Sequence, residues 1–196
     1  MEKKIIFATG NMGKLDEIRQ ILTGYEIVSM KEAGASIDIE ENGQTFEENA
    51  LIKARAVHAV TGGLVMADDS GLEVDALNKE PGVYSARYLG EDTPYDIKNA
   101  KILERLKDVP DEKRTARFVC AIAAVCPDGS ELVVRGVMEG VIAHEIAGMR
   151  GFGYDPIFMV PEFGMTNAEL TNEQKNEASH RGKALRAMRD LLLEQA

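Results

Sequence analysis

Acidic side chains gather at two places in the sequence where they could hold a divalent cation. Asp68 and Asp69 follow a buried apolar run and precede Ser70, while Glu40 and Glu41 stand just before a glycine. Carboxylates from different elements could bind Mg²⁺, which prefers oxygen ligands and is usually shared with substrate phosphates. Paired like charges at a buried edge are costly without a counter-ion, which favours a functional pair at Asp68 and Asp69. The alternatives are an Asp-rich turn that caps a helix and, at Glu40 and Glu41, solvated surface.

A glycine-bearing turn near the N-terminus could bind an anion. Its residues are Thr9, Gly10, Asn11, Met12, Gly13 and Lys14. A turn from a strand into a helix aims backbone N–H groups and the positive helix end at a ligand, which suits phosphate. Lys14 adds a positive charge that a helix start disfavours unless an anion compensates. The spacing is neither GxxxxGK[ST] nor GxGxxG, so an ordinary βα turn with a solvated lysine is the alternative.

The segment 151–156 could contact an aromatic ring of a ligand. Two glycines around an aromatic residue permit close backbone approach, and Phe152 or Tyr154 could stack on a nucleobase. The alternative is a tight turn packed by its own aromatic side chains.

The basic segment 175–183 offers hydrogen-bond donors. His180 and Arg181 could donate to a carbonyl or phosphate oxygen, and a helix break near Ser179 could bring Lys175 and His180 to one pocket. A basic helix end on the surface is the alternative, and it is favoured when the segment is taken alone.

The elements that must position these residues alternate between strands and helices. The patterns predict strands over 3–8, 25–29, 64–67, 118–125 and 131–138, and helices over 15–22 and from about 45, 94 and 176. The apolar run 118–125 is typical of a central strand, and the alternation over 131–138 predicts an antiparallel partner. The sequence therefore predicts an α/β fold with a mixed sheet.

Composition limits the classes of protein. The 196 residues carry 23 Lys plus Arg against 33 Asp plus Glu, a net charge of −10, and are 44% hydrophobic, which predicts one globular domain. A duplex-binding protein needs a basic face, so nucleic acid is not an expected partner. No apolar run approaches the roughly 20 residues that span a bilayer, and no signal peptide is visible, so we expect no membrane association and a cytoplasmic location. Cys120 and Cys126 are expected to be buried thiols.

Seven segments together resemble the inosine triphosphate pyrophosphatase family, the non-standard purine nucleotide pyrophosphatases also called Ham1-like or RdgB-like proteins. They occur in order over almost the whole chain, which makes the match specific. The segments are TGNMGK at 9–14, EENGQTFEENALIKAR at 40–55, ADDSGL at 67–72, PGVYSARY at 81–88, FGYDPIF at 152–158, AELT at 168–171 and SHRG at 179–182.

The resemblance implies Mg²⁺-dependent hydrolysis of ITP, dITP and XTP to the monophosphate and pyrophosphate, which cleanses the nucleotide pool. It also implies a homodimer and a single two-lobed domain over 1–196, built on an elongated mixed sheet with flanking helices around a central cleft. By the matching motifs, Thr9 to Lys14 would hold the triphosphate, with Lys53 as a further phosphate contact. Glu41 and Asp69 would bind the metal.

The resemblance assigns further roles to single residues. Asp69 would also be the catalytic base, and Ser70 would touch the substrate. The base and its surroundings would be contacted by Phe152, Gly153, Tyr154, Asp155, Lys175, His180 and Arg181. Whether Glu40 or Asp68 joins the metal site stays open, as does the residue that excludes GTP. Two alternatives remain: a Maf-like pyrophosphatase that prefers pyrimidine nucleotides, and a nucleotide-binding module without catalysis.

Overall fold

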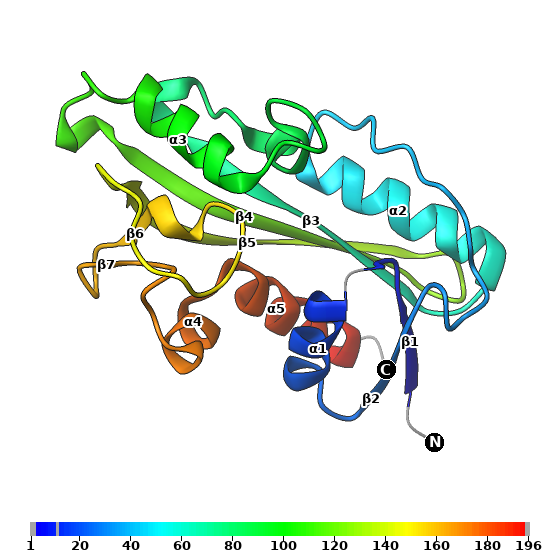
Figure 1. Ribbon diagram of the computed structural model, residues 1–196. Helices are drawn as coiled ribbons and strands as arrows, with labels where there is room; N and C mark the ends of the chain where they lie inside the picture. Colours follow the sequence, from blue (N-terminus) through cyan, green and yellow to red (C-terminus); the bar gives the residue numbers. More distant parts are fainter. Residues whose placement is uncertain (1–2, 11, 195–196) are drawn as a thin grey trace. The chain divides into compact units, whose positions relative to one another are not determined.

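The computed structural model describes residues 3–10 and 12–194 (Figure 1). For residues 3, 12, 13, 17, 176 and 177 it describes the backbone alone. The strands are β1 (Lys3–Phe7), β2 (Tyr25–Ser29), β3 (Val65–Val74), β4 (Thr115–Val125), β5 (Glu131–Ile142), β6 (Phe158–Val160) and β7 (Met165–Thr166). The helices are α1 (Met12–Ile21), α2 (Phe46–Thr61), α3 (Tyr95–Arg105), α4 (Asn172–Ala178) and α5 (His180–Glu194).

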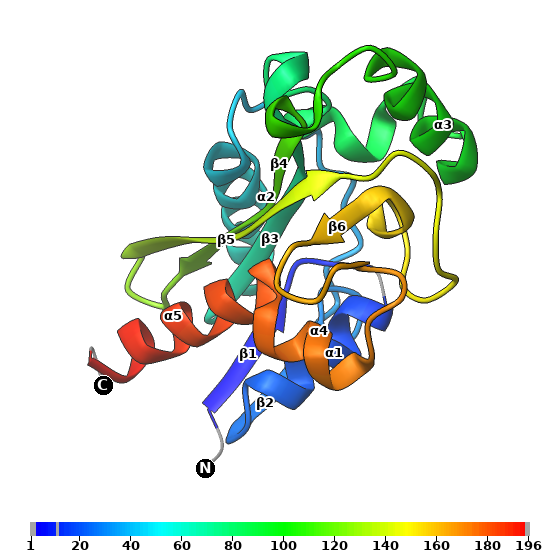
Figure 2. The same cartoon turned by 90° about the vertical axis from the view of Figure 1, so that its left-hand side faces the viewer.

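The strands form one mixed sheet in the order β2-β1-β3-β4-β5-β6-β7. β1 lies between β2 and β3 and is parallel to both (Figure 2). β6 is antiparallel to β5 and to β7. β4 and β5 are neighbours joined by the short turn 126–130, which is too short for a parallel crossover, so they are antiparallel as predicted. The α/β class and the mixed sheet with flanking helices are confirmed, whereas a two-lobed single domain around a cleft stays a prediction.

The chain divides into two compact units. The first unit comprises 1–69, 120–136 and 181–196, and the second comprises 70–119 and 137–180. Strands β3, β4 and β5 contribute residues to both units.

Two helix layers cover the strands of the first unit. Ile5 and Phe7 of β1 are buried together with apolar side chains of α1 and α5, among them Leu15 and Leu185. Helix α2 lies on the opposite side of these strands (Figure 1) and buries its own apolar stripe, which includes Ala54. Because side chains alternate across a strand, consecutive residues of β3 face different helices.

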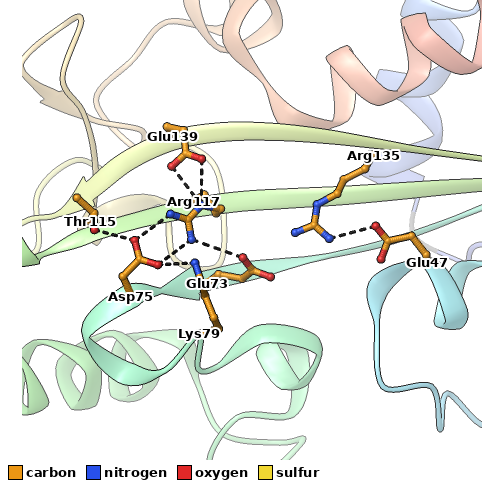
Figure 3. Close-up of polar contacts among 8 residues, drawn as sticks. All are labelled: Glu47, Glu73, Asp75, Lys79, Thr115, Arg117, Arg135 and Glu139. Atoms are coloured by element: carbon orange, nitrogen blue, oxygen red, sulfur yellow. Dashed lines mark hydrogen bonds and ion pairs between the residues drawn. The ribbon is translucent and has the colours of Figure 1, made fainter.

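The second unit has its own apolar core and a charged network on its strands. Its core is formed by α3, β6 and the second-unit parts of the long strands. Figure 3 shows Arg117 between three carboxylates, with Nη2 2.8 Å from Asp75, Nε 3.0 Å from Glu139 and Nη1 3.6 Å from Glu73. The hydrogen bonds from Arg117 hold the pKa of Asp75 well below its ordinary value.

Several details differ from the sequence prediction. β3 does not end at 67 but continues through Asp68 and Asp69, because β4 lies beside it and pairing along one edge sustains the strand. The last helix begins at His180 and not at about 176, because a separate helix, α4, precedes it and the extended backbone of Ser179 separates the two. Cys120 is buried as expected, but Cys126 is only half-buried.

Within residues 3–10 and 12–194, no helix has both the length and the apolarity to cross a membrane.

Candidate functional site

Asp68 and Asp69 point to opposite faces of β3 and meet different partners. The parallel neighbour β1 pairs only with Val65 and Met66, so both aspartates lie just beyond the end of β1. Asp68 shares a face with Met66 and is directed to the α1 and α5 side, and Asp69 is directed to α2. Ligands of α/β sheets bind where neighbouring strands end in this way.

Asp68 is a buried carboxylate with cationic partners. Its side chain is 2% exposed, and Lys14 Nζ donates to Oδ2 at 2.9 Å. Arg181 Nε lies 3.4 Å from the same oxygen. Burial would raise the pKa of Asp68, but the nearby cations, first of all Lys14, outweigh burial and hold that pKa well below its ordinary value. Asp68 therefore stays ionised and fixes Lys14.

The pKa of Asp69 is shifted in the opposite direction to that of Asp68. Asn49 Nδ2 donates to Asp69 Oδ2 at 3.0 Å, and Lys53 Nζ lies 3.9 Å from Oδ1. Burial raises the pKa of Asp69 to about 6, although Lys53 and the hydrogen bond from Asn49 act against it. A carboxylate with a pKa in this range is ionised at neutral pH and is more basic than an ordinary aspartate.

Glu41 reaches the same region from the loop before α2. Lys53 Nζ donates to Glu41 Oε2 at 2.9 Å. The preceding residues alternate in exposure, so that Ile37, Ile39 and Glu41 line a cavity while Glu40 is exposed. The structure thus places Glu41, and not Glu40, at the candidate site.

A cavity of about 280 Å³ lies within the first unit. It is lined by Ala8, Thr9, Gly10, Lys14, Met30, Ile37, Ile39, Glu41, Lys53 and Asp68. Helix α1 begins beside it at Met12, which brings the positive helix end to its wall. Two lysines and a helix start at one cavity suit an anionic ligand. The predicted residue Asn11 lies outside the described residues, and for Met12 and Gly13 only the backbone is described.

The carboxylates of the cavity fit a magnesium ion that keeps waters and substrate oxygens among its ligands. In the part of the chain that is described, no three His, Cys, Asp or Glu side chains are arranged as a metal site. Glu41 and Asp69, which both face the Lys53 ammonium, are the two carboxylates that would supply oxygen ligands. Mg²⁺ is usually held by one or two carboxylates plus phosphate oxygens, so this donor set suits it.

In the second unit, Asp155 organises the glycine-rich turn. Lys175 Nζ donates to its Oδ2 at 2.7 Å, Asn167 Nδ2 donates to Oδ1 at 2.7 Å, and the Phe152 N–H donates to Oδ2 at 3.2 Å. A Cβ at Gly151 would lie 2.0 Å from Asp155 Oδ2 and 2.2 Å from Lys175 Nζ. Any side chain at position 151 would therefore force this ion pair out of its present geometry.

The aromatic residues of the turn have different environments. Phe152 is 65% exposed and available to a ligand, whereas Tyr154 is 4% exposed. The Tyr154 hydroxyl donates to Ser85 O at 2.7 Å, so this side chain belongs to the core of the second unit. His180 stacks on Phe118 with ring centroids 5.1 Å apart.

The remaining predicted residues also have defined surroundings. Gly153 O accepts from Asn99 Nδ2 at 3.1 Å. Ser70 follows Asp69 in β3 and is half-buried. His58 of α2 is half-buried, and its Nδ1 lies 2.8 Å from Gly63 O just after the helix ends.

Sequence reasoning missed Asn49 and Asn167, which hold Asp69 and Asp155 respectively. Asn49 carries a usable signal, because it is a poor helix former placed in the apolar stripe of α2 and one turn before Lys53. Asn167 lies in an irregular segment and gives no comparable signal.

The comparisons with known proteins identify the family. Residues 5–191 match the model of the Ham1 family. The chain belongs to the Ham1 family. This confirms the resemblance of the seven sequence segments. A relative from Exiguobacterium sibiricum named dITP/XTP pyrophosphatase is 50% identical over 187 residues, which cover 94% of each chain.

Other members of the Ham1 family agree in sequence and fold. A dITP/XTP pyrophosphatase of Escherichia coli O157:H7 is 50% identical over 194 residues, covering 97% of this chain and 98% of the relative. The solved structure of the Staphylococcus aureus Ham1 protein has a TM-score of 0.92 and 42% identity, covering 99% of this chain and 100% of that one.

Proposed function

We propose that this protein hydrolyses non-standard purine nucleoside triphosphates, namely ITP, dITP and XTP, to the nucleoside monophosphate and pyrophosphate. The observation that carries the proposal is the cavity at which Lys14, Lys53, Glu41 and Asp68 meet, with Asp69 beside it. Relatives about half identical over nearly the whole chain, named dITP/XTP pyrophosphatase, support it.

The reaction needs a water to attack the α-phosphorus. In the proposed step, a new P–O bond forms at the α-phosphorus, the bond to the bridging oxygen breaks, and pyrophosphate leaves with the electron pair. Asp69 takes the proton of the attacking water, for which its raised pKa of about 6 suits it. Lys14 and Lys53 hold the phosphate oxygens. Bound Mg²⁺, held by Glu41 and Asp69, would neutralise phosphate charge and orient the chain.

A nucleotide panel with product identification tests the function. We expect pyrophosphate, not orthophosphate, as the first product from ITP, dITP and XTP, and only in the presence of Mg²⁺. ATP, which presents an amino donor at position 6 of the purine, should react orders of magnitude more slowly because buried donors would be left unpaired. Preference for pyrimidine nucleotides would favour the Maf-like alternative, and binding without turnover would favour a non-catalytic module.

We also propose that the base is contacted by Phe152, Asp155, Lys175 and His180. Exposed Phe152 could stack on a purine, and the Asp155–Lys175 pair offers a directed donor and acceptor.

The proposal also includes a homodimer, a cytoplasmic location and a role in cleansing the nucleotide pool. Solution scattering would test the dimer.

Substitution Gly151→Ala should weaken substrate binding. The added Cβ would displace Lys175 from Asp155, and loss of a charged hydrogen bond costs about 1.5–3 kcal/mol, so KM for XTP should rise about 10- to 100-fold. Gly164→Ala is the matched control, because Gly164 has a similar positive φ of +61° but nothing within 4 Å of its added Cβ. An unchanged KM in Gly151→Ala would exclude the pair from substrate binding.

A further inference from the structure

Helix α2 presents two side chains, Asn49 and Lys53, that connect the same two parts of the chain. They are four residues apart and therefore lie on one face of the helix, one turn apart. Lys53 joins Glu41 in the loop before the helix to Asp69 on β3, at 2.9 Å and 3.9 Å. Asn49 joins Gly43 of the same loop to Asp69. The loop and the strand are thus bridged twice.

The Asn49 bridge uses both ends of one buried amide. Asn49 is 1% exposed, its Nδ2 donates to Asp69 Oδ2 at 3.0 Å, and its Oδ1 accepts from the Gly43 N–H at 2.8 Å. A backbone N–H can only donate, so it fixes which end of the amide carries the oxygen. The amino group is therefore always presented to Asp69.

The loop packs against this amide too closely for any side chain at position 43. A Cβ on Gly43 would lie 2.7 Å from Asn49 Oδ1 and 2.8 Å from Glu48 Cβ. The next residue is held as well, because the Gln44 N–H donates to Glu48 Oε2 at 2.6 Å. The loop that carries Glu41 is thereby seated on the first turn of α2.

The two bridges respond differently to a ligand. The Lys53 ammonium would be attracted by phosphate and repelled by a divalent cation between Glu41 and Asp69, so we expect its contacts to change when a nucleotide binds. The Asn49 amide is neutral and buried, and each of its two ends already has a partner. We propose that Asn49 is a positioning residue. It keeps the loop that carries Glu41 at a fixed position relative to Asp69 while Lys53 turns to the substrate. This inference rests on the proposed function.

Mn²⁺ binding and turnover test the proposal in three variants. In Asn49→Ala both bridging bonds are lost, and in Gly43→Ala the loop is pushed from an intact Asn49. Thr45→Ala is the structural control, since it removes the N-cap bond to the Glu48 N–H at the same helix start without touching Asp69. Mn²⁺ affinity is measured by electron paramagnetic resonance with no nucleotide present, and kcat and KM are measured with XTP and saturating Mg²⁺.

We expect Asn49→Ala to weaken Mn²⁺ binding about 10- to 100-fold and to lower kcat about 100-fold, with little change in KM. Gly43→Ala should show the same pattern more weakly, because it displaces the loop from Asn49 but leaves the Asn49–Asp69 hydrogen bond in place. Thr45→Ala should lower the melting temperature but preserve Mn²⁺ affinity and kcat.

Two results would overturn the proposal. One is wild-type Mn²⁺ affinity and kcat in a folded Asn49→Ala or Gly43→Ala variant. The other is an equal loss in Thr45→Ala, which would indicate general loosening of α2. Failure of the proposed function is separate, because it would show as absence of pyrophosphate release from XTP by the unaltered protein.

Discussion

Replacing Asp69 by asparagine should lower kcat for XTP by about 10³-fold or more, because the amide cannot accept the proton that we propose Asp69 takes from the attacking water. Asparagine keeps the shape of the side chain, and its oxygen can still accept from Asn49, which lies 3.0 Å from Asp69. Nucleotide binding should therefore persist, and equilibrium binding of a non-hydrolysable XTP analogue would measure it. Asp108→Asn, at an exposed position, is the control for the loss of one aspartate. Substantial turnover by Asp69→Asn would show that another residue acts as the base.

The same substitution should stabilise the protein when no divalent cation is present. Burial raises the pKa of Asp69 to about 6 from its ordinary 3.8, so between these values the folded chain holds a proton that the unfolded chain has lost. Wild-type stability therefore falls as pH rises through this interval, by on the order of 2–3 kcal/mol in total. Urea denaturation should show Asp69→Asn as the more stable protein at pH 7.5 and the two as nearly equal near pH 4. Lower stability of the variant at pH 7.5 would contradict this account of Asp69.

The sequence alone was sufficient to predict the elements that carry the site. The alternation and run length of apolar residues predict the strands and helices around Lys14, Lys53 and Asp69, since these patterns follow from burial of one face of an element. The family resemblance singles out Glu41 over Glu40, and the alternating exposure of residues 37–41 provides the physical reason.

The partners of the two aspartates could not be predicted. Consecutive carboxylates suggest a shared site, but their opposite faces became evident only once β3 was seen to continue through them. The bonds of Asn49 and Asn167 depend on where distant segments meet, and a buried asparagine has no spacing pattern of its own. The same holds for Gly43 and Gly151, whose missing side chains matter only because of what packs against them.

Substitution Asp68→Asn should have the opposite effect on stability to Asp69→Asn, although the two positions are adjacent. Asp68 is 2% exposed and lies 2.9 Å from Lys14 Nζ and 3.4 Å from Arg181 Nε. Removing one charge of a buried ion pair costs about 3–5 kcal/mol, so the free energy of unfolding at pH 7 should fall by about this amount. The exposed Asp16→Asn, which loses only a surface pair with Arg19, should change it by less than about 1 kcal/mol.

The pH dependence of this loss distinguishes a charge effect from a packing effect. The cations around Asp68, first of all Lys14, hold its pKa below the ordinary 3.8, so its ionised form stabilises the fold above that pH and the stabilisation is lost as pH falls further. The difference between wild type and Asp68→Asn should therefore be constant from about pH 5 to 8 and shrink below about pH 4. Since Lys14 would no longer be held, kcat/KM for XTP should also fall about 100-fold. A stability difference that persists undiminished at pH 3 would show that packing, and not the charge of Asp68, supports this side of the cavity.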